Sequence, residues 1–164
     1  MKRRLILMRH AKSSWESSAT TDHARPLNGR GRRSAPLVGA RLEELGWVPE
    51  LVVSSDAART RETWELLAPA FGGQAIVVCF SPELYGAGLR EIRSLAKEWD
   101  VSVGTVLLLG HNPGFEGALH ALSRERHEMT TANAALLSAE GASWASALAG
   151  SWSLEHLIRP RDLE

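Results

Sequence analysis

The sequence has a single cysteine, Cys79, no excess of charge of either sign and no long run of hydrophobic residues. One cysteine cannot form an intramolecular disulfide, which fits a reducing compartment. Nineteen basic residues balance nineteen acidic ones. The chain therefore lacks the overall positive field that holds nucleic acid or an anionic membrane surface, and any recognition of an anion must be local.

The N-terminus begins like a signal peptide but does not continue as one. Its basic start, residues 1–4, is followed by an apolar run, residues 5–8, that ends at Arg9. This run is too short for the hydrophobic region of a signal peptide, and no later stretch is long enough to span a bilayer. We therefore expect a cytoplasmic protein that binds neither membrane nor nucleic acid.

Short apolar runs alternate with segments of helical periodicity along the chain. This alternation is typical of an α/β domain with a mostly parallel central sheet flanked by helices. With 164 residues, 44% of them hydrophobic, the chain can build one core but not two. We predict one domain over residues 1–164 without a sizeable cap domain. The expected strands are 5–8, 51–53, 75–80 and 106–109, with 134–138 and 152–158 weaker, and the expected helices include 37–45, 58–67 and 89–95.

The start of the first helix has two solutions. Asn28 could cap a helix that runs to Leu45, with Pro36 inside it, or Ser34 could cap a shorter helix with Pro36 in its first turn. We favour the longer helix.

Three expected strands are followed by cations or imidazoles. Ligands of open α/β sheets bind beyond the carboxyl ends of the strands. Each of the segments 9–12, 54–59 and 110–114 brings such a group to that edge. The coincidence of three strand ends is a stronger signal than one arginine–histidine pair.

The residues at this edge suit phosphoryl transfer. Arginine holds two phosphoryl oxygens at once, a task that fits Arg9 and Arg59. A neutral imidazole offers a free electron pair near pH 7, and nearby arginines favour the neutral form. We assign nucleophilic attack to His10 and contact with a phosphoryl oxygen to His111. No zinc-spaced His/Cys set, Asp-x-Asp pair or phosphate-binding glycine-rich loop is present, so we expect neither metal nor cofactor.

Other classes of protein are less well supported. A cysteine phosphatase loop would need an arginine where Tyr85 follows Cys79. Residues 141–145 nearly match the nucleophile elbow of a serine hydrolase, but His156 precedes Asp162, which reverses the expected order. A noncatalytic phosphate-binding module remains an alternative, because the same residues would bind an anion with or without turnover.

At these motifs the sequence resembles the histidine phosphatase superfamily, which has the fold of cofactor-dependent phosphoglycerate mutase. The resemblance implies a catalytic core of Arg9, His10, Arg59 and His111. Within the superfamily it is similar to the phosphohistidine phosphatase SixA branch, which implies a signalling role. The matching segments are 5–10, then Ser54, Ser55, Arg59, Thr60 and Thr63, then 110–112, and for the SixA branch 9–15 and 22–28.

The sequence departs from the superfamily pattern at two points. Ala11 replaces the usual glycine after the histidine, a change we expect to be tolerated. The acid that protonates the leaving oxygen in mutases has no clear counterpart: Glu83 is the first candidate and Asp22 the second. An imidazole leaving group can carry its own proton, so this gap suits phosphohistidine better than an alkyl phosphate.

These arguments favour phosphohistidine of a protein, such as a histidine phosphotransfer domain, as the substrate. A small phosphorylated molecule is the alternative. Ser54, Asn112, Arg25 and Glu83 are candidate substrate-binding residues, and Thr131 is a further candidate for the pocket lining.

Overall fold

A six-stranded sheet forms the centre of the computed structural model, which describes residues 1–164. Its strand order is β3-β2-β4-β1-β5-β6, with the first four strands parallel and β5 antiparallel to both of its neighbours. This is the single-domain α/β architecture expected from the sequence. The strands are β1 Lys2–Arg9, β2 Leu51–Ser55, β3 Val77–Ser81, β4 Thr105–Gly110, β5 Ala134–Glu140 and β6 Ser153–Ile158.

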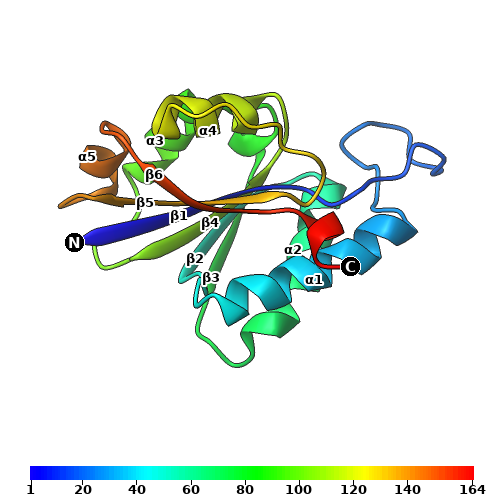
Figure 1. Ribbon diagram of the computed structural model, residues 1–164. Coiled ribbons are helices and arrows are strands. Elements are labelled where there is room, and N and C mark those ends of the chain that lie inside the picture. The colour runs from blue at the N-terminus through cyan, green and yellow to red at the C-terminus, as the bar shows by residue number, and fades with distance from the viewer.

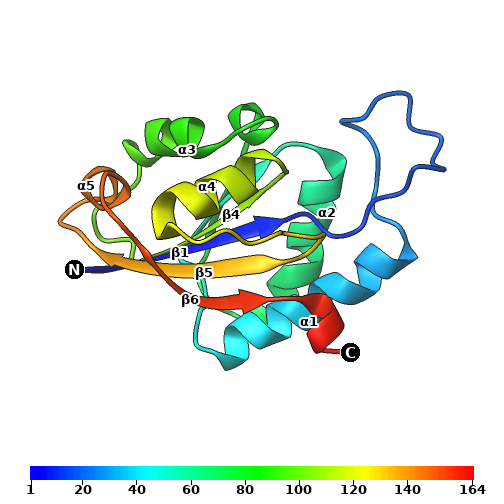
Figure 2. The same ribbon diagram turned by 45° about the horizontal axis from the view of Figure 1, so that its top comes forward.

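Helices cover both faces of this sheet (Figure 1). One face carries α1 and α2, and the other carries α3, α4 and α5; the turned view in Figure 2 shows the same division. The helices are α1 Gly29–Glu44, α2 Ala58–Leu67, α3 Leu89–Ala96, α4 Gly114–Ser123 and α5 Trp144–Leu148, with 3₁₀ turns η1 Ala68–Phe71, η2 Pro82–Leu84 and η3 Pro160–Asp162. No helix is both long and apolar enough to cross a membrane.

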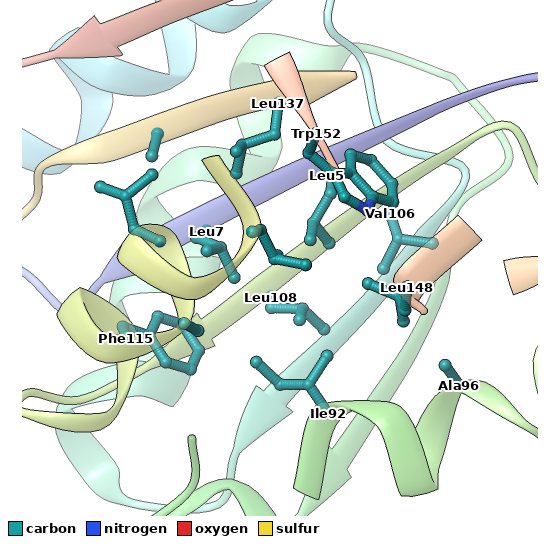
Figure 3. Packing of buried hydrophobic residues seen from close by; sticks show 14 of the residues in the cluster. Leu5, Leu7, Ile92, Ala96, Val106, Leu108, Phe115, Leu137, Leu148 and Trp152 are labelled. Carbon is teal, nitrogen blue, oxygen red and sulfur yellow. The ribbon is translucent and has the colours of Figure 1, made fainter. Parts of the chain in front are cut away.

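The hydrophobic core of the domain has two layers, one on each face of the sheet, and the side chains of β1 alternate between them, as the pleat of a strand requires. Leu5 and Leu7 belong to the core under α3, α4 and α5, where Phe115 of α4 packs near them (Figure 3). Ile6 and Met8 belong to the core under α1 and α2. Burial on both faces explains why residues 5–8 of this strand form a continuous apolar run in the sequence.

Helix α1 has the longer of the two predicted forms. The side chain of Asn28 accepts a hydrogen bond of 2.9 Å from the backbone N–H of Gly31, which caps the helix. Pro36 lies inside the helix on its exposed side. Helices α4 and α5 were not among the helices predicted from the sequence.

Strand β3 begins later than predicted, at Val77 instead of residue 75. Its pairing with β2 starts with Val77 opposite Leu51, the first residue of β2, so the preceding residues have no strand to pair with. Strand β2 extends beyond its predicted end to Ser55. Because β2 extends to Ser55, it is the side chain of Ser55 that lies at the carboxyl edge of the sheet.

The two longest connections, residues 10–28 and 124–133, follow β1 and precede β5. Because β5 is antiparallel to β1, both connections lie at the carboxyl edge of the parallel strands. Residues 10–28 contain no helix or strand beyond an isolated bridge between Ser13 and Leu27. The edge predicted to carry the chemistry is therefore bordered by loops and has no cap domain.

Candidate active site

His10 and His111 lie side by side because the strands that precede them are neighbours. Arg9 of β1 pairs with Gly110 of β4 in parallel register, and the N–H of His10 donates to the carbonyl of Gly110 at 3.1 Å. The two imidazole rings have centroids 5.2 Å apart. The topology thus brings together two residues separated by most of the chain.

The ring of His10 is buried, with 6% of the residue exposed. Its Nδ1 lies 2.7 Å from the carbonyl oxygen of Ala11. A carbonyl only accepts hydrogen bonds, so Nδ1 carries the hydrogen and Nε2 keeps a free lone pair. Burial lowers the pKa of His10 to about 3, and the positive charges of His111, Arg59 and Arg9 act in the same direction. His10 is therefore a neutral imidazole near pH 7.

The ring of His111 is held by Ser55. Nε2 of His111 lies 2.8 Å from the hydroxyl oxygen of Ser55, whereas its buried Nδ1 has no partner in the protein. Burial lowers the pKa of His111 to about 4, and the charge of Arg59 adds to the effect. A hydroxyl that donates to Nε2 leaves Nδ1–H as a donor for a bound oxygen.

The serine that contacts His111 is Ser55. Ser54, which the sequence suggests as a substrate-binding residue, does not reach this ring. Ser54 is wholly buried, and its hydroxyl donates to the carbonyl of Ser55 at 2.8 Å. Successive side chains of a strand point to opposite faces, so only one of the two can turn toward His111. The extension of β2 to Ser55 decides which one it is.

Arg59 is buried, whereas Arg9 is half-buried. Arg9 donates to the carbonyl of Met129 at 3.1 Å, and its Nε has no partner. Burial lowers the pKa of Arg9, and the negative charge of Glu116 acts in the opposite direction. Arg59 is 5% exposed, and its Nε also has no partner. With Nδ1 of His111, three buried nitrogens that can donate lack an acceptor, an arrangement suited to an anion.

Two threonines fix the first turn of α2, which carries Arg59. The hydroxyl of Thr60 donates to the carbonyl of Ser55 at 2.7 Å. The hydroxyl of Thr63 donates to the carbonyl of Arg59 at 2.7 Å and accepts from the N–H of Ala11 at 3.0 Å. These bonds tie α2 both to the end of β2 and to the residue after His10. They give a structural reason for the Arg-Thr-x-x-Thr pattern.

Asp22 reaches the site from the loop 10–28. Its carboxylate accepts hydrogen bonds from Tyr85, from Nε of Arg25 at 2.9 Å and from Arg59 at 3.1 Å. The hydrogen bond from Tyr85, with those of both arginines, holds the pKa of Asp22 well below its usual range. Asp22 is therefore ionised near neutral pH, which argues against a role as proton donor.

Glu83, the other acid candidate, lies on η2 with an exposed side chain that makes no hydrogen bond. Two residues later, the ring of Tyr85 packs edge-on to His111, with centroids 5.3 Å apart, and 5.8 Å from the guanidinium carbon of Arg59. The hydrogen bond to Asp22 raises the pKa of Tyr85. Tyr85 is thus a site residue that the sequence analysis missed, because no motif marked it.

Asn112 and Arg25 support the site indirectly. Nδ2 of Asn112 donates to Glu116 at 2.6 Å and to the carbonyl of Met129 at 2.7 Å, the same carbonyl that Arg9 contacts. Arg25 donates to the hydroxyl of Ser13 at 2.9 Å and reaches Arg59 only through Asp22. Thr131 lines a separate hollow on the α1 side of β1.

The serine-hydrolase alternative does not agree with the structure. Ser143 caps α5, which follows β5. Because β5 runs antiparallel to β1, its end lies at the edge of the sheet opposite His10. The elbow-like segment 141–145 therefore lies away from the carboxyl edge.

Fold and site together define an α/β protein in which two histidines and two arginines lie together at the carboxyl edge of the parallel strands. A model of the histidine phosphatase superfamily (branch 1) matches residues 5–93. An uncharacterized chloroplastic protein of Arabidopsis thaliana is 40% identical over 170 residues, which cover 96% of this chain and 78% of that protein. The chain belongs to the histidine phosphatase superfamily.

Two solved structures support the SixA resemblance. One, assigned as the phosphohistidine phosphatase SixA of Agrobacterium tumefaciens, is 29% identical with a TM-score of 0.81 and is matched over 96% of this chain and 98% of that one. The other, assigned as SixA of Nakamurella multipartitia, is 31% identical with a TM-score of 0.82 over 98% and 97%. The resemblance identified from the motifs is confirmed.

Proposed function

We propose that the protein is a metal-independent phosphatase that forms a covalent phosphohistidine at His10. The observation that carries the proposal is the neutral, buried ring of His10, whose Nδ1–H is held by Ala11 and whose Nε2 keeps its lone pair. In addition, Nε of Arg9, Nε of Arg59 and Nδ1 of His111 have no hydrogen-bond partner in the protein. A nucleophile beside preorganised donors is what phosphoryl transfer needs.

The reaction has two steps. In the first, the lone pair of Nε2 forms a bond to phosphorus while the bond to the leaving atom breaks and its electron pair departs with that atom. In the second, water attacks phosphorus, the N–P bond breaks and its electron pair returns to Nε2, which releases inorganic phosphate. Arg9, Arg59 and Nδ1–H of His111 stabilise the charge on the phosphoryl oxygens in both steps.

The proposed substrate is phosphohistidine on a protein, such as a histidine phosphotransfer domain of a cytoplasmic signalling system. Asp22 is held ionised, and Glu83 is exposed without a hydrogen bond, so neither is built as a proton donor. An imidazole that leaves with its own proton needs no such donor. The absence of a cap domain and the assignments of the two SixA structures support the same substrate.

The covalent step can be tested by trapping. Rapid acid-free quenching of the protein with a phosphohistidine substrate, followed by mass analysis, should place the phosphoryl group on His10. His10→Ala should abolish turnover, whereas the control His156→Ala, on the exposed surface of β6, should not. A label on another residue would refute the assignment. Tight phosphate binding without label or turnover would favour the noncatalytic module.

The substrate is tested separately by turnover of a phosphohistidine protein, a phosphohistidine peptide and common sugar phosphates. Glu83→Gln should leave hydrolysis of phosphohistidine nearly unchanged, because Glu83 is exposed and makes no hydrogen bond. A sugar phosphate as the far better substrate, with Glu83 essential for its cleavage, would contradict the proposed substrate while leaving the covalent mechanism intact.

A further inference from the structure

A second hollow lies at the same edge of the sheet, on the side of α1. It has a volume of about 280 Å³, and none of Arg9, His10, Arg59 and His111 lines it. Its walls come from three places: the segment after His10, the start of α1 and the connection before β5, with the C-terminal turn η3 closing one side. Figures 1 and 2 show η3 beside α1.

Three cations meet in this hollow. Lys12 follows His10, Arg30 lies in the first turn of α1, and Arg161 lies in η3. None of the three makes an ion pair or a side-chain hydrogen bond within the protein, and no carboxylate lines the hollow. In a chain with no net charge, this is a local concentration of unpaired positive charge.

The close approach of α1 to the backbone of Lys12 makes this convergence possible. A Cβ on Gly31 would lie 2.2 Å from the carbonyl oxygen of Lys12, so only glycine permits the helix to pack there. The same carbonyl accepts a 2.9 Å hydrogen bond from the N–H of Asn28, the residue that caps α1. Arg30 is thus held near Lys12 by fixed backbone contacts.

Asn133 supplies an independent observation. It lines the hollow, it is wholly buried, and its side-chain nitrogen Nδ2 has no partner in the protein. The hydroxyl of Thr130 donates to its Oδ1 at 2.9 Å, which fixes which end of the amide is the free donor. A buried donor without an acceptor is costly unless a ligand or water satisfies it.

We propose that this hollow is a second anion-binding site, which takes the phosphate or carboxylate group of a small molecule. The two arginines and the lysine supply charge, and Asn133 with the hydroxyl group of Thr131 supplies neutral donors. The volume exceeds that of a lone phosphate, so there is room for a small organic anion. The proposal does not depend on the substrate proposed for His10.

The second site shares a wall with the catalytic site. The N–H of Arg9 donates to the carbonyl of Asn133 at 3.1 Å, and the N–H of Ala132 donates to the carbonyl of His10 at 2.9 Å. These main-chain bonds join the connection before β5, which lines the hollow, to Arg9 at the end of β1 and to His10, the residue after it. An anion bound there is placed to affect the segment that holds His10.

Titration of isotope-labelled protein with inorganic phosphate, followed by NMR, tests the proposal. The side-chain amide of Asn133 and the backbone amide of Thr131 should shift saturably with one midpoint. The rings of His10 and His111 should report phosphate at the catalytic site with a midpoint of their own. Sodium chloride at matched ionic strength should not reproduce the shifts at Asn133 and Thr131.

The double variant Lys12→Gln/Arg161→Gln separates the two sites. It should raise the half-saturating phosphate concentration at Asn133 by roughly tenfold or more, since charge-assisted hydrogen bonds commonly contribute that much. The midpoint at His10 should be unchanged. The control Arg33→Gln, on the exposed side of α1 outside the hollow, should change neither midpoint.

Three results would overturn the proposal: no shift of Asn133 up to phosphate concentrations that saturate the catalytic site, an equal shift with sodium chloride, or an unchanged midpoint at Asn133 in the double variant. The replaced side chains are exposed, so the variant should fold. An unchanged amide spectrum elsewhere in the protein would show that it does.

Discussion

Asp22 and Arg59 are joined by two hydrogen bonds. One terminal nitrogen of Arg59 donates to the main-chain carbonyl of Asp22 at 2.8 Å, and the other donates to its carboxylate at 3.1 Å. Nε of the same guanidinium is left without a partner. The loop residue therefore fixes the orientation of the arginine to which the proposed reaction assigns the phosphoryl oxygens.

Arg59→Lys should lower kcat/KM by roughly a hundredfold, the usual effect of losing a preorganised charge contact. An ammonium group cannot hold the carbonyl and carboxylate of Asp22 and still present a planar fork to the phosphoryl group. Arg61→Lys is the matched control, because Arg61 is an exposed residue of α2 that donates to the carbonyl of Asp56. Steady-state turnover measures both variants, and full activity in Arg59→Lys would refute the role of Arg59.

Asp22→Asn should lower kcat/KM less than Arg59→Lys, by about tenfold, because the main-chain bond to Arg59 remains and Arg59 loses only its contact with a charged carboxylate. Since Asp22 is already ionised near pH 7, the pH dependence of kcat/KM should keep its shape. Rates from pH 5 to 8 check this point. A loss that grows with the pKa of the leaving group would instead identify Asp22 as the proton donor.

Ser55→Ala should lower kcat, by roughly tenfold, because His111 would lose the hydroxyl that orients its ring. Ser54→Ala is the matched control: it removes a hydroxyl one residue away that bonds only to the backbone. Its kcat should remain close to that of the native protein. Similar losses in the two variants would mean that the effect comes from β2 as a whole and not from contact with His111.

The four central residues of the site could be predicted from the sequence because they follow apolar strands or belong to short motifs. Parallel strands place their carboxyl ends at one edge, so Arg9, His10 and His111 needed only the strand pattern. Arg59 lies one helical turn from the end of β2. Local pattern and topology were sufficient for these residues.

The partners of these residues could not be predicted in the same way. Whether Ser54 or Ser55 meets His111 depends on where β2 ends, because a shift of one residue reverses the direction of a strand side chain. Tyr85 enters the site through loop packing, with no spacing rule that links it to Asp22 or His111. Such contacts depend on tertiary structure, which short sequence patterns do not encode.

The buried histidines should make stability depend on pH. The pKa of His10 is lowered to about 3 and that of His111 to about 4, below the ordinary histidine value. Between these values and about pH 6.5 the unfolded chain binds more protons, so the free energy of unfolding should fall as pH falls below about 6.5. Each group contributes a slope of at most about 1.4 kcal/mol per pH unit.

Urea denaturation of native protein and His10→Gln between pH 7.5 and 5 measures this effect. The variant lacks one of the two groups, so its free energy of unfolding should decline less steeply with falling pH. Over this interval the difference should be about 1–2 kcal/mol. Equal slopes in the two proteins would contradict the assignment of His10 as a buried neutral imidazole.

At the opposite edge of the sheet, Arg3 is wholly buried without a carboxylate partner. Its guanidinium donates to four carbonyls: those of Val101 and Val103 at 2.7 and 2.8 Å, and those of Gly141 and Ala142 at 3.2 and 2.9 Å. These carbonyls belong to the connection before β4 and the turn after β5. One side chain thus joins two loops that are distant in sequence.

Arg3→Met should lower the free energy of unfolding by about 3 kcal/mol or more, because it leaves several buried carbonyls without a donor. Arg4→Met is the matched control: the neighbouring Arg4 makes one exposed hydrogen bond, at 3.3 Å to the carbonyl of Gly46, and lies over the ring of Trp47. Its loss should cost about 1 kcal/mol or less. Urea denaturation measures both.

Because Arg3 lies at the edge opposite His10, the folded fraction of Arg3→Met should keep the native kcat. Native stability in Arg3→Met would show that the four bonds contribute nothing net, and a lowered kcat in folded protein would show that this edge is coupled to the site.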